Sequence, residues 1–284
     1  MEDQATLLRE MVHRSPAPPP HKLSKCQLIG VTSGKGGVGK TSVVVNLAMA
    51  LRRSGHKVAI FDADFGLANV DVFLGLTPSY HIGHVISGAM PLKSIITEGP
   101  EGLHILPASS GIQELTGMGE TRRERLIAQL DGLLDSYDYI LIDTAAGISE
   151  NVVRFLTVSR RVIVVSAPEP TAIVDAYALI KVLLKRDDSK EILVLINSVR
   201  GEEEAVDVFH QLAGVVERFL GQEVRLLGFV PRDEKMHQSV RKQEPILISY
   251  PKTAASRAFF RIARALQSIP PIQEMPVQVW RKMV

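Results

Sequence analysis

A glycine-rich loop between an apolar strand and a helix constrains this chain more than any other feature. Residues 29–41 read IGVTSGKGGVGKT and fit the pattern G-x-x-x-x-G-K-[ST]. Glycines let backbone N–H groups curl round a phosphate, and the helix that follows points its positive end at the same place. The pattern predicts a phosphate-binding loop formed by Gly34, Lys35, Gly36, Gly37, Val38, Gly39, Lys40, Thr41 and Ser42. Lys40 would reach the β- and γ-phosphates, and the Thr41 hydroxyl would bind Mg²⁺.

The rest of the chain alternates short apolar strands with helices. Strands are predicted at 57–62, 103–106, 139–143, 162–166, 192–197 and 225–230, and helices at 41–54, 122–134, 171–185, 203–220, 234–241 and 254–267. This alternation predicts one α/β P-loop NTPase domain, with a mostly parallel, doubly wound sheet covered by helices on both faces. We expect a helix at 1–14, a Pro-rich linker at 15–26, the NTPase domain at 27–268 and a C-terminal tail at 269–284.

Three carboxylates follow predicted strands, where ligands bind in such sheets. Asp143 ends YILID, and we assign it with Thr41 to Mg²⁺, directly or through water. Asp64 begins a loop, so it is better placed to orient or deprotonate the attacking water. Asp62 would either help to hold Mg²⁺ or position that loop.

The base of the nucleotide is expected to lie at the ends of two later strands. The Asn197 amide could read an adenine edge with both a donor and an acceptor, and Pro231 and Asp233 could form the other wall. Each of these residues could instead be a turn former. The chain has no N-K-x-D guanine-reading motif, so ATP is favoured over GTP.

Both ends of the chain carry short amphipathic segments. Residues 1–14 have apolar side chains at helical spacing ahead of the stiff spacer SPAPPP, which suggests either a partner-binding arm or a disordered tail. In the C-terminal tail, Val277, Trp280 and Met283 could form a membrane-binding apolar side. Pro276 shortens that helix, so the tail could instead pack on the core or be disordered.

Composition narrows the class of protein. A net charge of +2 does not imply the strong positive electrostatic potential that attracts nucleic acid. The chain has one cysteine, Cys26, which excludes a disulfide framework and a cysteine-ligated metal cluster within one chain. We find no secretory signal and no apolar run near the ~20 residues that span a bilayer, so a cytoplasmic protein is expected.

Three motifs in order carry a family resemblance: KGGVGKT, DADFGLANVD and DTAAGI. Together they resemble the deviant Walker A ATPases of the MinD/ParA family over residues 27–268. The resemblance implies a slow ATPase that forms a homodimer with ATP. It implies that Lys35 contacts phosphate in the other subunit, that Asp64 activates water, and that Asp143 is the Walker B aspartate.

Within that family, the chain resembles the regulators of flagellar number and placement. Asp3, Gln4, Ala5, Leu8 and Arg9 match the DQAxxLR motif through which those proteins stimulate the GTPase FlhF. The resemblance further implies flagellar switch-complex proteins as partners and reversible binding to the cytoplasmic face of the membrane. The alternative is a ParA-type partition ATPase that binds DNA, for which the chain offers only scattered cations such as Arg160-Arg161 and Arg257, Arg261 and Arg264. Iron–sulfur carriers of this family need cysteine pairs, which are absent.

Overall fold

The computed structural model describes residues 25–64, 69–107, 119–272 and 279–282. Eight strands form one sheet in the order β3-β4-β2-β5-β1-β6-β7-β8, and all neighbours are parallel except β3 and β4. The strands are β1 (Gln27–Thr32), β2 (Val58–Ala63), β3 (Thr97–Glu98), β4 (His104–Leu106), β5 (Tyr139–Thr144), β6 (Arg161–Ser166), β7 (Glu191–Val199) and β8 (Arg225–Pro231).

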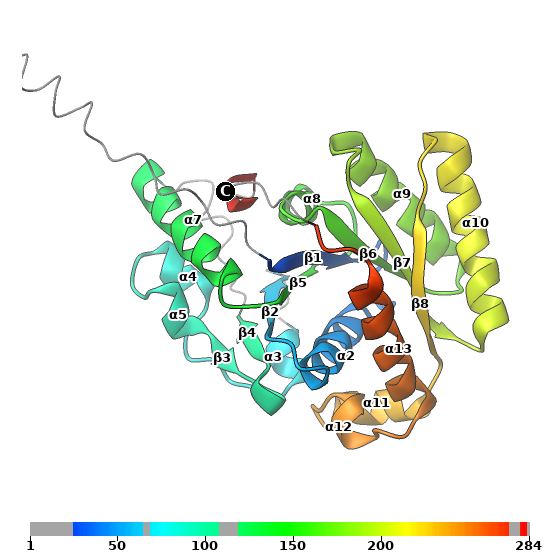
Figure 1. Cartoon of the computed structure of the whole chain (residues 1–284), viewed down its shortest axis with the longest axis horizontal. Helices are drawn as coiled ribbons and strands as arrows, with labels where there is room; N and C mark the ends of the chain where they lie inside the picture. Colours follow the sequence, from blue (N-terminus) through cyan, green and yellow to red (C-terminus); the bar gives the residue numbers. More distant parts are fainter. Residues whose placement is uncertain (1–24, 65–68, 108–118, 273–278, 283–284) are drawn as a thin grey trace, which may run out of the picture.

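Helices cover both faces of this sheet (Figure 1). One face carries α2 (Lys40–Arg53), α3 (Val70–Phe73), α12 (Ile246–Ser249) and α13 (Ala254–Ser268). The other carries α4 (Ile82–Ile86), α5 (Leu92–Ile95), α7 (Glu120–Leu134), α8 (Glu150–Thr157), α9 (Pro170–Arg186) and α10 (Glu202–Leu220). Helix α11 (Glu234–Arg241) follows β8, and the 3₁₀ turns are η1 (Pro100–Gly102) and η2 (Val279–Lys282).

The strands are apolar throughout because both faces are buried. In β1, Leu28 packs toward α7, whereas Ile29 and Val31 pack toward α2. Every residue of β1, β2, β5 and β6 is buried, as expected for parallel strands between two helical layers. The prediction of one α/β domain with a mostly parallel, doubly wound sheet is confirmed.

The C-terminal segment follows the alternative in which the tail packs on the core. Trp280, a candidate for the membrane-binding apolar side, is only 1% exposed and its ring lies edge-on to Phe61, with centroids 5.9 Å apart. Turn η2 packs against α7 (Figure 1). Arg281 Nη2 donates to both carboxylate oxygens of Glu124 at 2.8 Å. An apolar site on the core thus buries the indole that would otherwise face water. Val277 and Met283 lie outside the described residues.

Across those same described ranges, no helix has both the length and the apolar character needed to cross a membrane.

Candidate nucleotide-binding site

Steric constraints require glycine at several positions of the loop. Gly37 and Gly39 adopt positive φ angles of 83° and 86°, a region that side chains disfavour. A Cβ atom on Gly39 would also collide with the Asn197 amide nitrogen, and one on Gly34 would collide with the backbone of Asp175 in α9. The loop is therefore fixed between the start of α2 and the ends of the neighbouring strands.

Lys40 lies at the centre of the site in a buried ion pair. Its Nζ donates to Asp143 Oδ1 at 2.5 Å and lies 3.4 Å from Thr41 Oγ1. Burial raises the pKa of Asp143, and the Lys40 ammonium opposes that rise. The other carboxylate oxygen, Asp143 Oδ2, is buried without a hydrogen-bond partner among the described residues. A buried, unpaired carboxylate oxygen beside the Thr41 hydroxyl fits a Mg²⁺ site built from hard oxygen ligands.

Asp62 and Asp64 stand at the end of β2, with Asp62 beside Asp143 in the register. Asp62 Oδ1 accepts from the Asp64 backbone N–H at 3.1 Å. Its Oδ2 accepts from the N–H groups of Asn69 and Val70 at 3.2 and 3.3 Å. Asp62 thus ties together the two ends of the loop between β2 and α3, which fits the loop-positioning alternative. Burial, followed by the charge of Asp143, raises its pKa to about 7.

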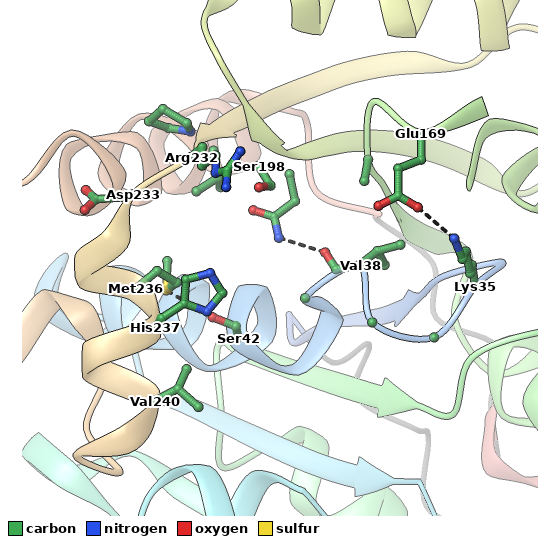
Figure 2. Close-up of a pocket in the computed structure, with 17 residues that line it drawn as sticks. Lys35, Val38, Ser42, Glu169, Ser198, Arg232, Asp233, Met236, His237 and Val240 are labelled. Carbon is green, nitrogen blue, oxygen red and sulfur yellow. Dashed lines mark hydrogen bonds and ion pairs between the residues drawn. The ribbon is translucent and has the colours of Figure 1, made fainter. Parts of the chain in front are cut away.

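Asn197 supports the phosphate loop. Its Nδ2 donates to the Val38 carbonyl at 2.7 Å (Figure 2), so the donor that was expected to read a base edge is engaged here. Asp233 caps α11 by accepting from the Lys235 N–H at 2.9 Å. Asp233 therefore has the structural role that the turn-forming alternative described, at the start of α11. Asn197 and Asp233 both also line the pocket.

A pocket of about 430 Å³ runs from the phosphate loop to α11. Sequence reasoning placed Asn197, Pro231 and Asp233 there but missed several other lining residues. The missed residues are Ala167, Glu169, Ser198, Val230, Arg232, Met236, His237 and Val240. Figure 2 shows Met236 and His237 on α11 across from Ser42 on α2, whose hydroxyl lies 3.2 Å from the Met236 sulfur. Three of the missed residues share one face of α11, and the signal for them was a helix directly after the strand-end segment GFVPRD.

The extra lysine of the loop lies at the opposite end of this pocket (Figure 2). Lys35 Nζ donates to Glu169 Oε2 at 2.7 Å and to Thr171 Oγ1 at 3.0 Å, at the start of α9. Lys35 therefore contacts the start of α9 whereas Lys40 contacts Asp143, and the Lys35 side chain is 38% exposed. Its expected role at a second subunit stays a prediction.

The N-terminal motif of Asp3, Gln4, Ala5, Leu8 and Arg9 lies outside the described residues.

A glycine-rich loop at the start of α2, with a lysine, a threonine and a strand-end aspartate around it, defines the chain as a P-loop NTPase. The ParA family, described as NUBPL iron-transfer P-loop NTPase, matches residues 25–267. Antiactivator FleN from Pseudomonas aeruginosa is 41% identical over 244 residues, which cover 86% of this chain and 87% of that protein. Flagellum site-determining protein YlxH from Helicobacter pylori is 35% identical, covering 85% of this chain and 82% of that protein.

Among solved structures, the septum site-determining protein MinD of Pyrococcus horikoshii, complexed with Mg-ADP, superposes with a TM-score of 0.71. It is 25% identical, and the alignment covers 86% of this chain and 97% of that one. The chain belongs to the MinD/ParA family of P-loop ATPases and is closely related to the flagellar regulators FleN and YlxH.

Proposed function

We propose that this chain is a nucleotide-dependent switch of the FleN/YlxH type, also called FlhG, which regulates flagellar number and placement. It binds ATP and Mg²⁺, forms a homodimer, and resets by slow hydrolysis to ADP and phosphate. The observation that carries this proposal is the deviant loop, whose Lys40 contacts a buried aspartate while the partly exposed Lys35 contacts the start of α9. The 41% identity to FleN supports the flagellar assignment.

Each residue of the nucleotide site has a distinct role in this proposal. The backbone N–H groups of the glycine loop and the Lys40 ammonium hold the phosphates. When nucleotide binds, Lys40 gives up its contact with Asp143 and contacts phosphate instead. Thr41 and Asp143 would hold Mg²⁺, which would supply positive charge to neutralise the phosphates. Asp64 orients the attacking water, and Asp62 keeps the loop after β2 in place.

Lys35 makes the switch depend on a second copy of the chain. In the single chain it is satisfied by Glu169 and Thr171. In the dimer it leaves these partners and contacts phosphate bound to the other subunit, where its charge stabilises the transferring phosphoryl group. Dimerisation therefore has to compete with the Lys35–Glu169 pair.

The N-terminal segment supplies the second activity. We assign Gln4, within the motif Asp3–Arg9, to the catalytic site of a FlhF-type GTPase, and we propose flagellar switch-complex proteins as further partners. The test is GTP hydrolysis by the flagellar GTPase with and without this protein. The wild-type chain should raise the rate and Gln4→Ala should not, whereas Lys22→Ala in the linker serves as a matched control. If the wild-type chain does not raise the rate of GTP hydrolysis, the FlhG assignment is wrong.

Membrane binding is assigned to the C-terminal tail, at the cytoplasmic face of the membrane. Because Trp280 is buried against Phe61, it must leave that site before it can reach lipid. Two tails on one dimer bind better than one through effective concentration. Trp280 is the single tryptophan, so its emission reports the change. With ATP and anionic vesicles containing brominated lipid, its fluorescence should be quenched; quenching that is equal with ADP would contradict this assignment.

The alternative, a partition ATPase on DNA, has weaker support. Arg161 is 3% exposed and paired with Glu191 at 2.7 Å, so it is not available to phosphate. On α13, Arg257 donates to the Lys252 carbonyl at 2.6 Å, and the Arg261 guanidinium lies over the Phe229 ring. An ATP-dependent, salt-sensitive shift of duplex DNA would revive this alternative.

A further inference from the structure

A second cleft opens at the other end of the sheet from the phosphate loop. Its volume is about 710 Å³, within the range of small-molecule sites. It is lined by Val58 and His104, the first residues of β2 and β4, whereas the nucleotide site uses Asp62 near the far end of β2. Helices α5 and α7 and strands β3 and β4 contribute lining residues. These four elements lie at the side of the sheet away from β7 and β8 (Figure 1). The two clefts are therefore separate.

Three cations from different elements converge on this cleft. Arg52 comes from the last turn of α2, Lys57 precedes β2, and Lys93 lies in α5. Within the described ranges, no carboxylate lies within ion-pair distance of any of the three. Glu98 is the acidic residue among the described lining residues, which leaves a net charge of +2 with histidine neutral.

Backbone carbonyls hold the Arg52 guanidinium in place. Arg52 Nη1 donates to the His56 carbonyl at 2.7 Å, and Nη2 donates to the Glu101 carbonyl at 3.0 Å. The Glu101 carboxylate pairs instead with Arg53 at 2.6 Å. Gly102, with φ 72°, leaves room for Arg52, because a Cβ there would lie 2.9 Å from Nη2. The structure thus fixes the Arg52 guanidinium at the cleft through backbone carbonyls, with the Glu101 carboxylate near enough to interact with its charge.

The floor of the cleft is apolar and rigid. Val58 and Leu133 are buried, and Tyr137 is 9% exposed. The Tyr137 hydroxyl and His104 Nδ1 are hydrogen-bonded at 2.8 Å, which fixes both rings. A ligand that suits this cleft carries concentrated negative charge on a compact apolar group.

We propose that this cleft binds a small phosphate monoester with a compact apolar group. A phosphate monoester is close to dianionic at neutral pH, which matches the net charge of +2 on the lining residues. The proposal is independent of the nucleotide site.

The test uses the full chain with saturating Mg-ADP, so that the phosphate loop is occupied, and phenyl phosphate as the probe in isothermal titration calorimetry. We expect one phenyl phosphate per chain and no binding of phenol. The double variant Lys57→Gln/Lys93→Gln should bind about tenfold more weakly or worse, since two unpaired cations are removed from a dianion. The control Lys181→Gln/Lys185→Gln removes two exposed lysines of α9 and should bind like wild type.

Several results would overturn the proposal. One is an absence of binding, and another is equal binding by the Lys57/Lys93 variant and the control, which marks a nonspecific anion effect. Inorganic phosphate that binds as tightly as phenyl phosphate would show that the apolar floor plays no part. Carbodiimide coupling of Lys57 or Lys93 to Glu2 or Asp3, found by mass spectrometry of the full chain, would assign the cleft to the chain's own N-terminal segment instead.

Discussion

Replacing Glu169 with glutamine tests the competition for Lys35. The substitution removes the carboxylate that holds Lys35 but keeps the size of the side chain. Lys35 is 38% and Glu169 62% exposed, so solvent screens the pair and its contribution is about 0.2–1 kcal/mol. Each dimer frees two such lysines, which favours association by about 0.4–2 kcal/mol. We therefore expect the dimer dissociation constant in ATP to fall by about 2- to 30-fold.

Sedimentation velocity with Mg-ATP measures this constant, in an Asp64→Ala background that blocks turnover. Glu217→Gln, an exposed glutamate of α10, is the matched control and should leave association unchanged. An unchanged constant for Glu169→Gln would show that the pair does not restrain Lys35. A weaker dimer would show that Glu169 contacts the partner subunit, and either result would refute the reasoning.

Three further predictions concern the loop, the tail and the cysteine. Gly39→Ala should destabilise the chain by about 1–2 kcal/mol and abolish nucleotide binding, because Gly39 has φ 86° and no space for a Cβ. Thermal unfolding and the binding of fluorescent ADP measure these two effects. Gly36 has open space for a Cβ, so the control Gly36→Ala should unfold like wild type. Trp280→Ala should lower the free energy of unfolding in urea by about 2 kcal/mol. This is less than the ~3–5 kcal/mol usual for a buried Trp, since the segment is short and terminal and its indole N–H has no partner among the described residues; a loss above 4 kcal/mol would contradict it. Burial raises the pKa of Cys26 to about 12, so a thiol reagent at pH 8 should react only after unfolding, and fast reaction of the native protein would refute this.

The parts of the fold that sequence predicted are those with strong periodicity. Buried parallel strands are continuous apolar runs, and long helices show a 3.6-residue stripe, so these elements were predicted within a few residues and α11 at both bounds. The short helices α3, α4, α5 and α12, the two-residue β3 and the helix α8 were missed. Two to five residues carry too little periodicity to separate a helix or strand from a loop. Helix α8 has the same length as α11, which was predicted, so length alone does not explain why α8 was missed.

Site residues that lie in local motifs were predicted from the sequence, whereas contacts between distant residues were not. Lys40, Thr41 and Asp143 follow from motif spacing, because the sheet brings strand ends together whatever the loops do. The Lys35–Glu169 contact joins residues 134 positions apart and leaves no local pattern. The sequence left the place of Trp280 open, because a short amphipathic tail has the same sequence pattern whether it covers a protein core or a membrane.

The central claim is that ATP, bound at this loop, drives dimerisation. Light scattering of the Asp64→Ala chain, with nucleotide binding checked by fluorescent ATP, measures this most directly. We predict twice the monomer mass with Mg-ATP, the monomer mass with Mg-ADP, and a monomer in both for Lys40→Ala. An Asp64→Ala chain that binds ATP and stays monomeric would contradict the account.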